Sequence, residues 1–379
     1  MLLVGLLFAV VSAFLWPANT GDMNNFLIPW LNTILEQGQV RAFAHPFANY
    51  TPPYLYLLAA MSPLASVFPK VTVIKLLSLL GTAGLWVAAC RLLRAADRPT
   101  EGALWLLLLP TIIANAAAMG QADAFWAAAC LMTLASAIER RPFAMLVWFG
   151  VAIAFKAQAV FLAPFVGHYL FQQKVRLAFW PAPLLVYVIA MLPAALVGWP
   201  ILDLLTVYLR QAQWNPVFIS NAANPWSLIQ YAAPQAGLAW LWIGDLAAIV
   251  AAFLLVSQFR RRPANDARWM LGLALLSALL IPYLLPKMHE RFFYLADVLA
   301  FLVAWVTRDR QFVIVAVLVE GGSLAALAGL LLRQPLFPVA GSAMVGAAIL
   351  LTLRQVARGR SQPQGGLDQS VTGAILSAA

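Results

Sequence analysis

Apolar blocks of about 15 to 22 residues recur from the first residue to about residue 353, and no other feature constrains the fold as strongly. The chain has 379 residues, of which only 24 are Lys or Arg and 14 are Asp or Glu. No soluble domain can be separated from this pattern, because the polar stretches between the blocks are short. Blocks of this length and hydropathy are typical of transmembrane helices. The sequence therefore predicts an all-α polytopic membrane protein.

The placement of the basic residues predicts the topology. A net charge of +10 would suggest nucleic acid as the partner of a soluble protein, but here Lys and Arg cluster in alternate short loops, as cytoplasmic loops do. We therefore expect no nucleic-acid partner. With the N-terminus in the cytoplasm, about twelve spans are predicted, near residues 2–16, 70–90, 102–118, 122–138, 142–155, 157–172, 177–198, 237–257, 267–285, 292–307, 311–332 and 336–353. The stretch 142–172 could instead form one tilted helix, although two spans keep every basic cluster in the cytoplasm.

The chain outside these spans lies mainly in predicted outer loops, at 17–69, 199–236 and 286–291. Within the first loop, residues 23–38 alternate apolar and polar side chains in the pattern of a helix lying on the membrane surface. The following segment, 50–68, is apolar but interrupted by proline, and we interpret it as half-inserted from the outer side. Residues 1–357 are predicted to form a single transmembrane domain, and the polar residues 358–379 a disordered cytoplasmic tail.

The loop Pro286–Arg291 carries three basic side chains between two apolar blocks. Lys287, His289 and Arg291 form a compact set suited to a phosphate at the depth of the lipid headgroups. Lys156 and Arg291 each precede a predicted span, where free backbone N–H groups and the helix dipole favour an anion. Interfacial anchoring of long basic side chains is the alternative reading, and for Lys156 it is left open.

Acids outside the cytoplasmic loops are the candidates for proton transfer, because a charge at bilayer depth is costly. Asp22 lies five residues beyond the first block with no basic residue near it in sequence, a position suited to a general base, although a solvated loop acid would look the same. Asp123 is a candidate for substrate binding or for capping its own helix. Three acids fall within predicted spans, where pairing inside the bundle is as good an interpretation as function: Asp245, Asp297 and Glu320.

Five motifs in order resemble those of the GT-C membrane glycosyltransferases, and most closely those of bacterial proteins grouped with the GPI mannosyltransferases. The resemblance covers about residues 1–310. The motifs are Asp22–Phe26 continuing to Trp30, Asn49–Tyr56, Gly120–Ala124, Phe155–Gln158 and Lys287–Phe292.

The resemblance implies transfer of a sugar from a polyprenyl-phosphate monosaccharide to a hydroxyl at the outer face of a bacterial inner membrane, with inversion at the anomeric carbon. Mannose is the first expectation for the sugar, and a glycan, a glycolipid or a protein for the acceptor. Asp22 maps to the base, and Lys287, His289, Arg291 and Lys156 to the donor phosphate. The remaining motif positions are expected to bind substrate: Asn49, Tyr50, Gln121, Asp123 and Glu290.

The sequence predicts no cofactor and no metal site. Cys90 and Cys130 lie inside predicted helices without metal-binding spacing and are expected to be packing residues. Many relatives have an acidic pair where only Asp22 is evident here, so a divalent metal is possible but not indicated. A transporter or flippase of a lipid-linked sugar is the main alternative function, since it would use the same basic headgroup site. A non-catalytic scaffold would need neither the acid nor the basic loop.

Overall fold

The computed structural model describes residues 2–214, 221–233, 240–258 and 266–358, and within these ranges the chain forms helices and no strand longer than an isolated bridge. The predicted tail beyond residue 358 lies outside the described residues. The longer helices are α1 (Leu2–Leu15), α4 (Lys70–Ala95), α7 (Asp123–Ile138), α8 (Pro142–Phe155), α9 (Ala163–Gln172), α10 (Ala182–Val197), α14 (Leu241–Gln258), α15 (Ala267–Leu284), α16 (Tyr294–Thr307), α17 (Arg310–Leu332) and α18 (Leu336–Arg358).

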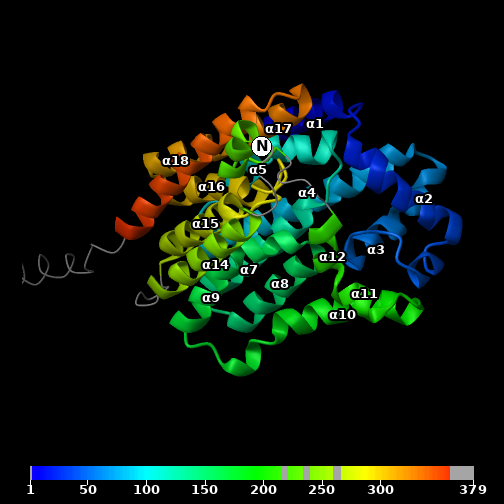
Figure 1. The fold of residues 1–379 in the computed structure, drawn as a ribbon, viewed down its shortest axis with the longest axis horizontal. Helices are drawn as coiled ribbons and strands as arrows, with labels where there is room; N and C mark the ends of the chain where they lie inside the picture. The colour runs from blue at the N-terminus through cyan, green and yellow to red at the C-terminus, as the bar shows by residue number, and fades with distance from the viewer. Residues whose placement is uncertain (1, 215–220, 234–239, 259–265, 359–379) are drawn as a thin grey trace, which may run out of the picture.

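Each predicted span corresponds to one of these helices or to a broken run of short ones, so the all-α polytopic fold is confirmed (Figure 1). The run 102–118 is the broken one: it consists of α5 (Gly102–Leu106), α6 (Pro110–Ile113) and a π-helical turn at Ala114–Ala118. Among the described residues, five helices are long and apolar enough to cross a membrane: Lys70–Ala95, Leu177–Val197, Ala267–Leu284, Arg310–Leu332 and Leu336–Arg358.

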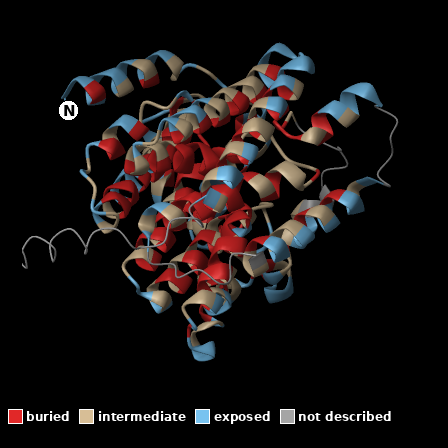
Figure 2. Ribbon diagram, turned by 90° about the vertical axis from the view of Figure 1, so that its left-hand side faces the viewer, coloured by how far each residue is buried: buried red, intermediate tan, exposed pale blue. Residues whose placement is uncertain are grey.

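The core lies where α7, α15 and α16 meet, and the more peripheral helices are exposed (Figure 2). Almost every residue of α15 between Met270 and Pro282 is buried, whereas α1 buries only Val4 and Ser12. Leu2, Leu3 and Phe14 of α1 are more than three-quarters exposed. Apolar side chains exposed on this scale are what a lipid-facing helix presents.

The first outer loop folds against the helices. Its predicted surface helix is present as a π-helical turn, Met23–Leu27, continuing into α2 (Ile28–Gln37). The apolar side chains of this element are buried in a second core cluster with α3 (Pro52–Met61) and α4. The segment 50–68 is thus a packed short helix, because Tyr54, Leu55 and Leu58 of α3 are buried.

The stretch 142–172 is two helical segments, and a single tilted helix is excluded. Lys156 is extended (φ −159°, ψ 138°) between α8 and a 3₁₀ turn, Ala157–Leu162, that leads into α9. The hydroxyl of Thr51 donates to the carbonyl of Phe155 at 3.2 Å, which satisfies one of the free acceptors at the end of α8. This break turns the backbone at Lys156 towards the first outer loop.

The second predicted outer loop forms α11 (Ile201–Leu205), α12 (Val207–Trp214) and α13 (Pro225–Ala232). Its residues 221–226 form hydrogen bonds with the end of α15 and with the loop 286–291. Asn224 donates to the carbonyls of Pro282 and Leu285, and the Trp226 indole donates to the Leu284 carbonyl at 2.7 Å. Asn221 forms an antiparallel bridge with His289. The late basic loop is therefore held by a segment about 65 residues earlier in the chain.

Two of the three acids inside the bundle have hydrogen-bonding partners there. Asp297 accepts from the Ser323 hydroxyl at 2.8 Å, and Glu320 accepts from both the backbone N–H and the hydroxyl of Thr111. These contacts join α6, α16 and α17, which agrees with pairing inside the bundle. Asp245 is the exception, since it is exposed on α14 and lines a cavity. Cys90 and Cys130 are buried and unbridged, as a packing role requires.

Candidate active site

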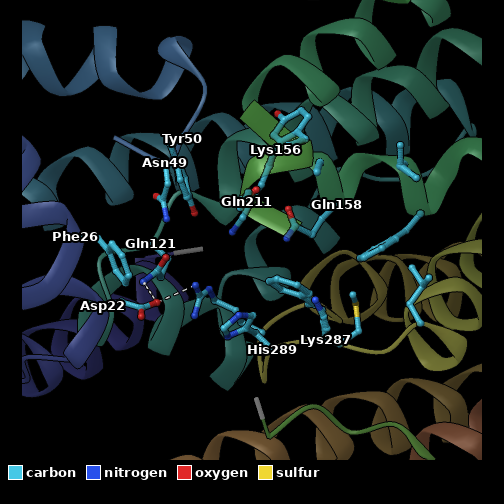
Figure 3. A pocket seen from close by; sticks show the side chains of 18 of the residues that line it. Asp22, Phe26, Asn49, Tyr50, Gln121, Lys156, Gln158, Gln211, Lys287 and His289 are labelled. Atoms are coloured by element: carbon cyan, nitrogen blue, oxygen red, sulfur yellow. Dashed lines mark hydrogen bonds and ion pairs between the residues drawn. The ribbon is translucent and has the colours of Figure 1, made fainter. Parts of the chain in front are cut away.

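A cavity of about 770 Å³ opens where the first outer loop, the start of the α9 segment and the loop 285–292 meet. Figure 3 shows labelled side chains from all three parts converging on this space. Eight of the ten sequence-predicted site residues line it: Asp22, Asn49, Tyr50, Gln121, Lys156, Lys287, His289 and Arg291. The other two, Asp123 and Glu290, are buried behind the lining.

Asp22 and the basic loop line the same cavity and are in direct contact. Nη2 of Arg291 lies 2.8 Å from Oδ2 of Asp22, and the Gln121 amide donates to the same oxygen at 3.3 Å (Figure 3). Asp22 and Arg291 therefore form an ion pair. Among the described residues no group bonds Oδ1 of Asp22, and its side chain is 34% exposed.

Arg291 is surrounded by carboxylates. Nη1 lies 2.8 Å from Oε1 of Glu290, and Nε lies 3.7 Å from Oδ2 of Asp123, in addition to the Asp22 contact. Burial opposes the charge of the guanidinium, but these three acids outweigh it and raise the pKa of Arg291. Burial raises the pKa of Glu290 in turn. Arg291 is thus a fixed cation shared among acids, and Glu290 is one of its partners.

Asp123 is the anchor of this network. The sequence left open that it caps its own helix, and that interpretation is wrong because its carboxylate makes no cap hydrogen bond. Oδ1 accepts from the Trp126 indole and lies 2.5 Å from Nζ of Lys156, while Oδ2 accepts from the Asn115 amide. Carboxylate and lysine are both nearly fully buried, so the Lys156 charge is compensated within the protein.

Lys156 therefore differs from a free interfacial cation. Its ammonium contacts Asp123 and lies 5.7 Å and 5.9 Å from the ring centroids of Tyr50 and Phe292. Those rings favour a cation over their faces. Because Lys156 also lines the cavity, an anion there would compete with Asp123 for it.

His289 is neutral around pH 7. Burial, assisted by the neighbouring Arg291, lowers the pKa of His289 to about 4. The histidine can therefore contribute a hydrogen bond to a phosphate, and the positive charge must come from its neighbours. Lys287 lines the same wall in a left-handed backbone conformation (φ 57°).

Several cavity residues were not among the ten predicted site residues. Gln158 and Gln211 contribute amides, Asp245 an acid, and Phe26, Trp30 and Phe292 rings. Gln158 belongs to the Phe155–Gln158 motif, which was the only sequence signal for it. Among the described residues no group of three His, Cys, Asp or Glu side chains could hold a metal. Asp22, Asp123 and Glu290 are instead paired with Arg291 or Lys156.

The all-α polytopic fold is consistent with a membrane glycosyltransferase of the GT-C type. Residues 28–172 match the family model described as alpha-(1->6)-mannopyranosyltransferase, N-terminal domain. The match covers less than half of the chain, and it supports a mannosyltransferase activity. The matched region contains Asn49, Tyr50, Gln121, Asp123 and Lys156; Asp22 and the loop 286–291 lie outside it. No curated protein sequence matches the chain.

Proposed function

We propose that this enzyme transfers mannose from a polyprenyl-phosphate donor to an acceptor hydroxyl at the outer face of a bacterial inner membrane, with inversion at the anomeric carbon. The observation that carries the proposal is one cavity holding both Asp22 and the Lys287, His289 and Arg291 side chains. An acid for the acceptor and cations for the departing phosphate are the two components that such a transfer requires.

The reaction is a single displacement. The acceptor oxygen attacks C1 of the mannosyl group while the bond from C1 to the phosphate oxygen breaks, and the electron pair leaves with the lipid phosphate. Asp22 takes the acceptor proton, and Oδ1 is the oxygen that remains available for it. Lys287 and Arg291 stabilise the charge that grows on the departing phosphate.

Arg291 couples donor binding to the activity of the base. Its guanidinium contacts Asp22 Oδ2 at 2.8 Å. A donor phosphate bound next to Arg291 would draw that contact away from Asp22, because both anions compete for the same N–H groups. Asp22 would then act as a stronger base once the donor is in place.

The lipid chain leaves the cavity on its apolar side. Val160, Phe161, Leu241 and Leu285 line that side, and Val160 is 47% exposed. These residues belong to the 3₁₀ turn before α9, to α14 and to the position directly after α15, so the donor would enter between those elements. Of the segment 50–68, only Tyr50 lines the cavity.

The family description suggests an α-(1→6) linkage for the product. An α-linked product follows by inversion from a β-linked donor, which is the stereochemistry that single displacement predicts. Partners would be the polyprenyl-phosphate mannose donor, membrane lipids, and a glycan, glycolipid or protein acceptor. Residues 1–357 would act as one transmembrane unit, with both termini in the cytoplasm.

Transfer of radiolabelled mannose by the purified protein in nanodiscs tests the reaction. Label should pass from polyprenyl-phosphate mannose to a mannoside acceptor, and a nucleotide-linked mannose should not serve as donor. Movement of the intact lipid-linked sugar between leaflets of a vesicle without transfer would support a flippase and contradict the proposal.

Cysteine labelling tests the face. In a variant lacking Cys90 and Cys130, an impermeant reagent added outside should modify a cysteine at His45 and miss one at Arg94; both native side chains are exposed. External labelling at residue 94 would place the Arg91, Arg94 and Arg98 cluster outside and overturn the assignment of the cavity to the outer face.

A further inference from the structure

Two amide side chains at the cavity make no hydrogen bond to the part of the chain that the structure describes. Gln158 is 8% exposed, and its Oε1 is buried without a partner. Asn49 also lines the cavity, and its Oδ1 is likewise buried and unpartnered. A buried amide left without partners destabilises the fold, so such groups in a native protein call for an explanation.

Three other amides near the site donate hydrogen bonds through their NH₂ groups, although the Oδ1 atoms of Asn115 and Asn224 are also buried without a partner. Gln121 donates to Asp22, Asn115 donates to Asp123, and Asn224 donates to two carbonyls beside the basic loop. Each of these has a role in holding the protein together. Among the described residues, the side chains of Gln158 and Asn49 make no such structural contact.

Gln158 reaches the cavity because of the break in the helix at Lys156. The 3₁₀ turn Ala157–Leu162 begins directly after the extended Lys156, and Gln158 is its second residue. Figure 3 shows the Gln158 side chain pointing into the cavity together with Asn49 and Gln211. Lys156, two residues earlier, is fixed by Asp123, so the backbone that carries Gln158 is anchored.

Building on the proposed function, we propose that Gln158, with Asn49 across the cavity, recognises the hydroxyl groups of a pyranose ring. An amide presents one acceptor and a pair of donors, the combination that binds two neighbouring hydroxyls of a sugar. The aromatic side chains of Trp30 and Tyr50, which line the same cavity with ring centroids 5.1 Å apart, provide an apolar face for the ring. The pyranose is either the donor mannose or the first residue of the acceptor, since both carry the same hydroxyls.

Gln158→Met tests this inference, because Met keeps the length of the side chain and removes both polar ends. With Gln158 recognising the sugar, kcat/KM should fall about tenfold to a hundredfold, since the substrate hydroxyls lose their partners. The melting temperature of the ligand-free variant should stay unchanged or rise, because an unpartnered buried amide has been removed. Gln172→Met is the matched control, since Gln172 lies on α9 away from the cavity lining, and it should change neither quantity.

Monodeoxy donors and acceptors identify which sugar Gln158 contacts. For the substrate that it binds, removal of one particular hydroxyl should abolish the difference between the wild-type enzyme and Gln158→Met. Equal losses with every deoxy donor and every deoxy acceptor would overturn the inference, as would a fall in melting temperature with unchanged kcat/KM.

The two proposals can fail separately. Mannose transfer by the wild-type enzyme with an unaffected Gln158→Met variant would leave the proposed function standing and reject the sugar subsite. Without transfer from any polyprenyl-phosphate donor, the proposed function fails, and the shift in melting temperature caused by a mannoside still tests Gln158. The subsite is then supported only when that shift is present in the wild-type protein and lost in Gln158→Met.

Discussion

Lys75 and Lys156 are both buried, yet their charges are met in different ways. Lys75 on α4 donates to the backbone carbonyls of Trp16 and Ala18, both at 2.6 Å, and thereby holds the start of the first outer loop. Lys156 is paired with the Asp123 carboxylate, which also faces Arg291 at the cavity. Carbonyls of the main chain cannot change their charge or be displaced, whereas a carboxylate shared by two cations responds to any anion that arrives.

The difference shows which buried charges belong to the site. The hydrogen bonds from Lys75 to the Trp16 and Ala18 carbonyls, which we call the Lys75 clip, fix the backbone that leads to Asp22. Lys75 does not line the cavity. The network of Asp22, Asp123, Lys156 and Arg291 lines or backs the cavity, and a phosphate placed there would redistribute its contacts. Substitutions in the network should therefore affect catalysis or leave a charge unbalanced, and substitutions at the clip should affect mainly stability.

The largest effect is expected for Asp22→Asn. The amide keeps the shape and can still meet Gln121, but it cannot take the acceptor proton, so kcat should fall by about a hundredfold to ten-thousandfold. Affinity for the donor should be retained or slightly increased, because Arg291 is freed from its carboxylate partner. Steady-state transfer and equilibrium binding of the polyprenyl-phosphate sugar check both parts. A variant within a few-fold of the wild-type kcat would make Asp22 a loop acid without a role as base.

Lys156→Met should cause the largest loss of stability. The substitution leaves the fully buried Asp123 with only Arg291 at 3.7 Å as a cation, and removing one partner of a buried pair typically costs about 3–5 kcal/mol. Denaturant unfolding in detergent micelles measures the change. The double variant Lys156→Met with Asp123→Asn should recover much of the loss, because the uncompensated charge is gone. No recovery would mean that Lys156 stabilises the fold by packing and not by charge.

Most of the fold was predictable from the sequence, because apolar length and the alternation of basic loops are encoded locally. The break at Lys156 was predicted only because two spans, and not one, keep every basic cluster in the cytoplasm. The structure gives the break a cause in the extended backbone of Lys156 and the Thr51 contact. The burial of the first outer loop was not predictable. Its apolar residues fit either a lipid interface or a protein core, and only tertiary contacts with α3 and α4 decide between them.

The members of the candidate site were largely predictable, but their pairing was not. Asp22 and Arg291 are far apart in the sequence, so no spacing reveals that they are in contact. Asp123 looked like a helix cap, because a first-turn acid is typical of one, until Lys156 and Arg291 were placed beside it. The assumed charge on His289 depended on exposure, and burial removes it.

Lys75→Met should have a smaller effect than Lys156→Met and of a different kind. Two carbonyls at the end of α1 lose their donor, and unsatisfied buried acceptors cost about 1–3 kcal/mol. Because no acid is left unpaired, a compensating acid-to-amide substitution should bring no recovery. The kcat should stay within a few-fold of wild type, as Lys75 does not line the cavity. A loss of kcat comparable to that of Asp22→Asn at full stability would show that the clip is part of the catalytic apparatus.

The smallest effect is expected for His289→Gln. With a pKa of about 4, below its ordinary value of 6.5, His289 is neutral above about pH 5, so glutamine replaces one neutral donor with another. The KM for the donor should rise only a few-fold, and its dependence on pH between 6 and 8 should be unchanged.

The folded protein binds fewer protons at His289 than the unfolded chain does. Wild-type stability should therefore fall as the pH drops from 6.5 towards 4, and His289→Gln should lose less over that range. A wild-type donor KM that increases as the pH rises through 6.5, and a flat profile in His289→Gln, would show that the histidine binds the donor as a cation, and the phosphate would then draw on three charges from this loop.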